Sequence, residues 1–156
     1  PHYLGGVRAF IAAGATIVTT PGNAALVRDL GARPFRLAPD RQEYAQKSVV
    51  VDTFSTRYEL ADSTNRLIAV NIGARSAHTD EFVVFWFPRA NLVFETEQGW
   101  RTSDGTLRAS RRAAGFLHVL DEEHLDARRI VQSWPMRGTE RERTRGQIED
   151  LIAAQH

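Results

Sequence analysis

The chain has 156 residues, of which 42% are hydrophobic and 25% are charged, and its formal net charge is +1. These values are typical of a soluble globular protein of one domain, and the near-neutral charge argues against nucleic acid or a membrane surface as a partner. The chain has no cysteine, which excludes disulfides and thiolate metal sites. From the sequence we expect neither a membrane span nor a signal peptide, and the cellular compartment stays open.

The first third of the chain alternates between helical and strand patterns. Apolar residues at helical spacing predict a first helix near Leu4. Residues 15–20 (ATIVTT) then predict a β-branched strand, and a second helix is expected from an Asn23 cap to Gly31. Residues 32–48 contain two prolines and many polar side chains, which predicts a long irregular loop. The alternation indicates an α/β layered architecture.

Strand patterns dominate the middle of the chain, where strands are predicted at 49–54, 57–60 and 66–72. The densest apolar run, residues 82–87 with four aromatic side chains, predicts a strand buried on both faces. A turn leads from it to a second strand at 92–95. His78 precedes the first of these two strands and Glu97 follows the second. Pairing of the strands would bring both residues to one end of a sheet, where α/β folds usually keep functional groups.

The last third predicts a loop, a helix, a short strand and a final helix. Residues 98–106 are polar and contain glycine, which predicts the loop, and 107–120 carry one apolar helical face. Residues 130–131 predict the strand. The final helix is expected to begin at Thr139, with 140–145 as a solvated face of ion pairs.

Four stretches, taken in chain order, resemble the metallo-β-lactamase-fold hydrolases. They are Tyr3-Leu4-Gly5-Gly6-Val7-Arg8, Ala77-His78-Thr79-Asp80, Asn91-Leu92-Val93-Phe94-Glu95-Thr96-Glu97, and the segment from Leu125 to Gly138. The first is similar to the end of the family's HxHxDH metal motif, and the second is similar to the sequence around its third histidine. The third resembles the strand that supplies a bridging aspartate, and the fourth resembles the approach to the last histidine. The resemblance implies the C-terminal half of an αββα sandwich over residues 1–156, with a mixed sheet and flanking helices.

The resemblance also implies which positions would hold a metal. His78 matches the family's third histidine, and the bridging aspartate falls on Glu97. The aspartate of the first motif falls on His2 and its final histidine on Tyr3, while the last histidine falls on Arg137. The first two histidines would precede this chain. We therefore expect His78, Glu97 and His2 as candidate metal ligands, with Tyr3 and Arg137 at substituted ligand positions.

A catalytic zinc ion needs about three protein ligands and an open position for water. Tyr3 is a poor substitute for imidazole, and Arg137 is a permanent cation that would repel a divalent ion and could pair with Glu97 instead. We expect a hydrolase-family domain that lacks a complete dinuclear centre, with zinc as its cofactor and, if the protein is active, metal-assisted hydrolysis as its reaction. Apart from the resemblance, His78 has the pattern of an ordinary loop histidine. Without a metal, Glu95 and Glu97 would be solvated charges at the end of a strand.

A second hypothesis belongs to another class, a non-catalytic binding or assembly module. Half of a sandwich leaves an apolar sheet face that needs a partner. The partner would be the missing N-terminal half or a second copy of the chain, so a homo-oligomer is expected. A weaker third hypothesis is contact with nucleic acid. The arginine group Arg108, Arg111 and Arg112 could contact phosphate, although no aromatic residues are interleaved with it.

Overall fold

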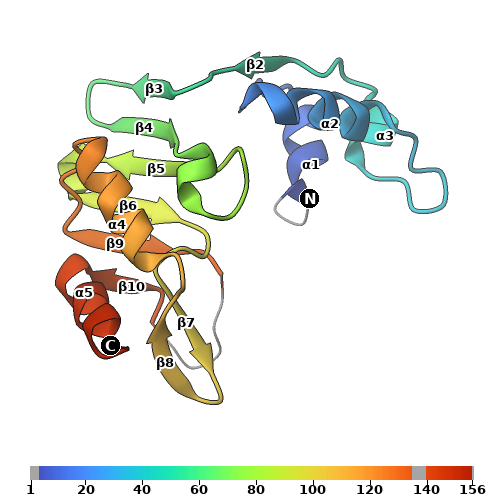
Figure 1. The fold of residues 1–156 in the computed structure, drawn as a ribbon. Helices are drawn as coiled ribbons and strands as arrows, with labels where there is room; N and C mark the ends of the chain where they lie inside the picture. Colours follow the sequence, from blue (N-terminus) through green and yellow to red (C-terminus); the bar gives the residue numbers. More distant parts are fainter. Residues whose placement is uncertain (1–3, 135–139, 156) are drawn as a thin grey trace. The chain divides into compact units, whose positions relative to one another are not determined.

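A computed structural model of the protein describes residues 4–134 and 140–155 (Figure 1). The chain divides into two units, Pro1–Ser55 (unit 1) and Thr56–His156 (unit 2). His2, Tyr3 and Arg137 lie outside the described residues. No helix in the described part is long and apolar enough to cross a membrane. That residues 1–156 act as a single domain stays a prediction.

Unit 1 is a small α/β layer. Its elements are α1 (Val7–Ala12), β1 (Ile17–Thr19), α2 (Pro21–Ala32), α3 (Arg41–Ala45) and β2 (Val51–Thr53). The predicted helix, strand and helix are confirmed, and β1 pairs in parallel with β2. Two predictions are wrong in detail. Thr20, not Asn23, is the N-cap of α2, and the segment predicted to be irregular contains α3, because the Asp40 carboxylate caps it by accepting from the backbone N–H of Glu43.

Arg8 on α1 joins the helices of unit 1. Its guanidinium donates to Asp40 at 2.5 and 2.9 Å. It also donates to the carbonyl oxygens of Leu30 and Arg33, at 2.7 and 2.8 Å, which lie at the C-terminal end of α2. The ring of Phe35 lies 4.2 Å away. The hydrogen bond from Arg8 lowers the pKa of the Asp40 carboxyl to about 2. Only 8% of the surface of Arg8 is exposed, and its guanidinium satisfies oxygen acceptors at the end of α2 and at the start of α3.

Unit 2 is built on a six-stranded mixed sheet of order β10-β9-β6-β5-β4-β3. The strands are β3 (Arg57–Ala61), β4 (Arg66–Asn71), β5 (Val83–Phe87), β6 (Leu92–Glu95), β9 (Arg129–Gln132) and β10 (Glu142–Thr144). Neighbouring strands are antiparallel except for β6 and β9, which are parallel. Since β4 and β6 are both antiparallel to β5, the C-terminal ends of β4, β6 and β9 lie at one edge of the sheet. This α/β class with a mixed sheet was predicted and is confirmed.

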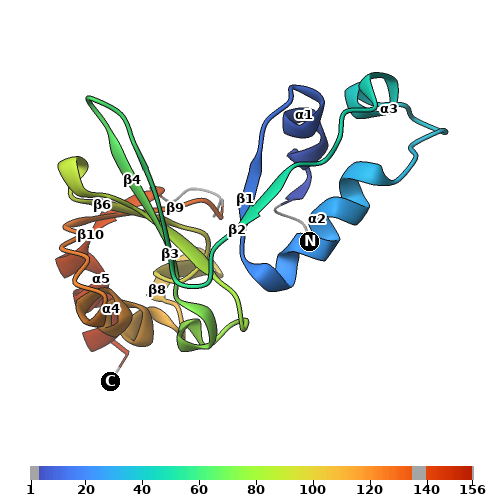
Figure 2. The same ribbon diagram turned by 90° about the horizontal axis from the view of Figure 1, so that it is seen from above.

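The helices α4 (Ala113–Glu122) and α5 (Arg145–Ala153) cover one face of this sheet (Figures 1 and 2). Alternate strand residues point toward them, and Val84, Val93 and Ile130 are fully buried there. Phe116 and Leu120 of α4 pack in the same cluster. Burial of these apolar side chains, at roughly 1.5–3 kcal/mol each, is what holds the helices to the sheet.

The opposite face of the sheet is also apolar. The strand register places one row of side chains across five strands: Tyr58, Ala69, Phe85, Phe94 and Val131. The rings of Phe85 and Phe94 lie 6.3 Å apart between centroids. Most of this row is half-buried, and on the helix side of β5 Val84 is fully buried while Trp86 is half-buried. The prediction of a strand buried on both faces is therefore wrong.

Two further predictions about unit 2 are wrong. Residues 98–106 were expected to form a loop and Leu107 to belong to a helix, but they contain a hairpin of β7 (Trp100–Ser103) and β8 (Thr106–Ala109). Its turn residues Asp104 and Gly105 both have positive φ, 54° and 74°, which is the conformation that favours Asp-Gly in two-residue hairpins.

The acidic and basic run 140–145 was predicted as a helix face, but it contains β10. Glu142 on this strand pairs with Arg129 across the ladder at 2.6 Å. Helix α5 begins only at Arg145, because Thr144 and Gln147 form a reciprocal capping box. Thr139, the predicted start, lies outside the described residues.

Replacing Arg8 with Met removes the donors and keeps much of the apolar side chain. We expect Arg8→Met to raise amide hydrogen exchange in α1 and α2 by roughly tenfold or more, because the oxygen acceptors lose their partner. Arg33→Met is the matched control, since Arg33 is exposed and pairs only with Asp29 one helical turn away. Hydrogen exchange is measured by mass spectrometry. Equal exchange rates of α1 and α2 in the two variants would contradict the role of Arg8.

The same contact predicts a response to acid. The pKa of Asp40 is lowered on folding from its ordinary value of 3.8 to about 2, so the stabilisation is present above pH 3.8 and is lost as the pH falls toward 2. In Arg8→Met the stability lost through protonation of Asp40 should be absent. Thermal unfolding followed by circular dichroism between pH 2 and 4 measures this difference.

Candidate functional site

The loop that follows β4 carries His78, and the side chain of Asn71 closes it. The Asn71 Oδ1 atom accepts the backbone N–H groups of Gly73 and Phe82, at 3.0 and 3.1 Å. Gly73 has a φ of 48°, and a Cβ at this position would lie 2.9 Å from the carbonyl oxygen of Asp80. Only glycine fits there without strain, so the shape of the loop is set by its sequence.

The hydroxyl of Ser76 orients His78 within this loop. Ser76 is buried, and its Oγ accepts the backbone N–H of His78 at 3.2 Å and that of Thr79 at 3.4 Å. The imidazole packs in a tilted arrangement against Phe82, with 5.9 Å between ring centroids. The histidine is therefore held on two sides, by its backbone and by its ring.

A buried carboxyl group fixes the loop that follows β6. Glu95 has no exposed surface, and its carboxylate accepts the backbone N–H groups of Gln98 at 2.6 Å and Gly99 at 3.2 Å. Burial raises the pKa of Glu95 to about 7, against the opposing effect of these hydrogen bonds. The prediction that Glu95 is a solvated strand-end charge is wrong, because its side chain points toward the helices rather than toward solvent.

Gln132, at the end of β9, holds the far side of the same loop. Its Oε1 accepts the N–H of Trp100 at 3.2 Å, and its Nε2 donates to the carbonyl of Trp100 at 3.1 Å. The pairing of β6 with β9 also continues beyond the strands, from the N–H of Trp134 to the carbonyl of Thr96 at 2.9 Å. The residues on both sides of Glu97 are thus anchored.

These two loops bring His78 and Glu97 into contact. His78 Nε2 lies 2.5 Å from Glu97 Oε1, and about a quarter of each side chain is exposed. The prediction that the paired strands gather these residues at one end of the sheet is confirmed. Their role as metal ligands stays a prediction, and His2, Tyr3 and Arg137 cannot be placed beside them since they lie outside the described ranges.

An imidazole nitrogen and a carboxylate oxygen are both zinc ligands, so the pair fits part of a zinc site. Two ligands at 2.0–2.1 Å from one tetrahedral ion lie about 3.3 Å apart, so His78 and Glu97 would have to separate by about 0.8 Å to share it. Within residues 4–134 and 140–155, no three His, Cys, Asp or Glu side chains are grouped so that they could hold a metal ion.

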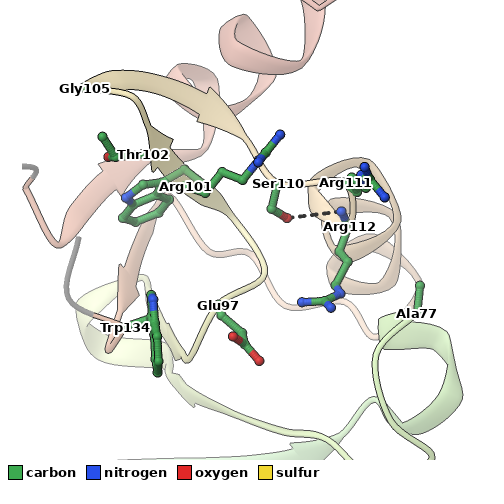
Figure 3. Close-up of a pocket in the computed structure, with 10 residues that line it drawn as sticks. Ala77, Glu97, Arg101, Thr102, Gly105, Ser110, Arg111, Arg112 and Trp134 are labelled. Carbon is green, nitrogen blue, oxygen red and sulfur yellow. Dashed lines mark hydrogen bonds between the residues drawn. The ribbon is translucent and has the colours of Figure 1, made fainter.

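A cavity of about 860 Å³ lies beside Glu97 (Figure 3). The hairpin β7–β8, the segment before α4 and Trp134, two residues after β9, form its walls. Its lining residues include Glu97, Arg101, Arg111, Arg112 and Trp134. Ala77, next to His78, also borders it, so the histidine and the glutamate lie at the margin of this cavity.

No protein-family model and no curated protein matches the chain. Solved structures do match. A metallo-β-lactamase from Pontibacter korlensis aligns with 98% of this chain and 64% of its own, at 18% identity and a TM-score of 0.57. The DIM-1 metallo-β-lactamase aligns with 98% and 63%, at 12% identity and a TM-score of 0.55. The chain has the metallo-β-lactamase fold. The chemotaxis sensor ODP, a structure of its peroxy diiron species, aligns with 99% and 65%, at 9% identity and a TM-score of 0.54.

The fold predicted from the four motifs is therefore confirmed, and the chain spans slightly less than two thirds of the length of these matched structures. Sequence reasoning found the two residues in contact but missed the cavity. Arg111 and Arg112 were noted only as members of a basic group, Arg101 was assigned to a loop, and Trp134 was not singled out. No aromatic residue is interleaved with the arginines in the sequence. The aromatic residue of the cavity is Trp134, which follows β9, and sequence spacing does not reveal that it lies near the arginines.

Gln132 can be tested as the anchor of the Glu97 loop. We expect Gln132→Met to reduce the free energy of unfolding by about 2 kcal/mol or more, because the N–H and the carbonyl of Trp100 lose a buried partner. Urea unfolding followed by tryptophan fluorescence reports on unit 2, which contains all three tryptophans. Gln155→Met is the control, since exposed Gln155 makes one bond to Ala109 near the chain end, and its effect should stay within about 0.5 kcal/mol. Equal effects would refute the role of Gln132.

Proposed function

We propose that this chain is a metallo-β-lactamase-like hydrolase domain in which His78 and Glu97 supply two ligands of a single zinc ion, without a complete dinuclear centre. The observation that carries the proposal is the 2.5 Å contact between His78 Nε2 and Glu97 Oε1. The contact lies where the C-terminal ends of β4 and β6 meet, which is where ligands bind in open α/β sheets. Fold alone does not assign an activity, so the proposal rests on these two side chains and their neighbouring cavity.

The remaining ligands have to come from outside the described residues. His2 is the candidate within this chain, and the resemblance predicts further histidines before it. Arg137, at the position of the family's last histidine, would oppose a second metal ion and could neutralise Glu97 in its place. This substitution supports a single ion in preference to a pair.

When bound, zinc would activate water and polarise the bond to be hydrolysed. The residues of this chain have separate tasks in that reaction. His78, fixed through Ser76 and Phe82, would hold its Nε2 toward the cavity margin. Glu97 would present a carboxylate at the cavity wall, and the anchors Glu95 and Gln132 would limit the movement of its loop.

Zinc binding is the direct test. We expect the purified chain to retain zinc after incubation with excess metal and desalting, and His78→Ala and Glu97→Ala to lose it, as measured by elemental analysis. His118→Ala is the matched control, because His118 makes a similar pair with Glu122 at 3.2 Å on the exposed surface of α4. A protein free of zinc after this treatment, or zinc retained equally by all variants, would refute the proposed site.

A second candidate function is that of a non-catalytic assembly module. It is favoured by the apolar row on the sheet face opposite α4 and α5, which includes Phe85 and Phe94. Apolar sheet faces of this kind are usually paired with another layer. We propose a second copy of the chain, or the part of the fold that the matched structures have beyond its span, as the partner.

Association can be measured by light scattering. If the apolar row pairs two copies, the chain should have the mass of a dimer at high concentration, and Phe94→Asp should shift it toward the monomer because a carboxylate would be buried in the interface. Tyr44→Asp, at an exposed aromatic residue of α3, should leave the mass unchanged. A chain that remains monomeric at every concentration would rule out self-association through this face.

A further inference from the structure

The cavity beside Glu97 concentrates positive charge. Three arginines line it, Arg101 from β7 and Arg111 and Arg112 from the segment before and at the start of α4. None of the three forms an ion pair with a carboxylate of the described residues. Glu97 is the one acidic side chain among the described lining residues, and His78 already contacts it. The cavity therefore has more cations than its own acids neutralise.

Some arginines of unit 2 are paired with acidic residues, as in Arg66 with Glu59, Arg129 with Glu142 and Arg145 with Asp121. What sets the cavity apart is that three arginines without such a pair among the described residues gather around it. The guanidinium is a planar donor that matches phosphate or carboxylate oxygens in pairs. Arginines left without such a partner around one cavity indicate that the partner is a ligand.

The hairpin adds an independent observation. The register places Arg101 directly opposite Arg108, and like charges in this position destabilise an antiparallel pair. No acidic residue of the hairpin stands between them, since its only acid, Asp104, lies in the turn. An anion bound on this side of the hairpin would offset the repulsion.

The opposite wall of the cavity is aromatic. Trp134 follows β9, and 45% of its surface is exposed. Figure 3 shows its indole on the far side of Glu97 from Arg112, with Arg101 extending toward Ser110 above them. An exposed indole offers a flat apolar surface on which a planar ring can stack. The cavity thus combines an anion-binding side with a ring-binding side.

We propose that this cavity binds a small aromatic phosphate monoester, with the phosphate group held by Arg101, Arg111 and Arg112 and the ring placed against Trp134. A phosphate dianion matches several guanidinium groups better than a single carboxylate does. As a substrate pocket the assignment rests on the proposed hydrolase function. Binding itself requires no metal and is tested without one.

The test uses adenosine 5′-monophosphate as the probe, by isothermal titration calorimetry on the metal-free full chain. We expect Arg112→Gln and Arg101→Gln each to weaken binding about tenfold or more, because a charged hydrogen-bond donor is lost. Arg128→Gln, at an exposed arginine outside the cavity, should leave the affinity unchanged. Trp134→Ala should weaken binding of the nucleotide and bring its affinity close to that of inorganic phosphate.

Several results would overturn the proposal. One is equal weakening in Arg128→Gln and Arg112→Gln, which would mean non-specific attraction to positive charge. Benzoate binding more tightly than the nucleotide would assign the cavity to carboxylates, and adenosine binding as tightly would remove the role of the arginines. Circular dichroism checks that each arginine variant is folded. Because two variants are used, the test remains valid if one of them does not fold.

The outcome is separable from that of the zinc experiment. If the unsubstituted chain retains no zinc but binds the nucleotide, the anion site stands and the metal site is refuted. Zinc retained by a chain that does not bind the nucleotide would give the opposite result.

Discussion

The buried carboxyl group of Glu95 is the interaction on which the candidate site depends. A carboxyl group without solvent is costly unless donors surround it, and here the donors are the N–H groups of Gln98 and Gly99. Those N–H groups can reach the carboxylate only if the chain turns sharply after β6. This turn places Glu97, two residues after Glu95, at the end of the sheet. A polar group in the core thus determines where an exposed polar group lies.

Asn71 does for β4 what Glu95 does for β6. Each residue ends its strand with a side-chain oxygen that accepts two N–H groups of the following loop. Because β4, β6 and β9 end at the same edge, the two loops and Trp134 gather there, although β4 and β6 are each bonded to β5 and not to one another. The order of the strands therefore brings the two loops close together. The side-chain oxygens of Asn71 and Glu95 then fix the loops so that His78 lies 2.5 Å from Glu97.

The sequence predicted the sheet well where its signals were local. The apolar runs around Val84 and Val93 have the spacing of paired strands, and their pairing places His78 and Glu97 together. Other elements depended on contacts far apart in sequence: β10 exists because β9 offers an edge, although its residues Glu142 to Thr144 have helical charge spacing. The Asp104-Gly105 pair was a local hairpin signal that the polar composition around it concealed. The burial of Glu95 was not visible in the sequence, since an acid at a strand end is usually solvated.

The metal and the anion that we propose would favour one another. Glu97 is the acidic group on the wall of a cavity that also holds three arginines. A zinc ion bound to Glu97 would cancel its negative charge and leave the guanidinium groups a stronger field for an anion. By linkage, an anion held by the arginines would then raise the affinity for zinc by the same factor. If Arg137 neutralised Glu97 instead, the arginines would attract an anion more strongly even without a metal. Anion binding would then not require a metal.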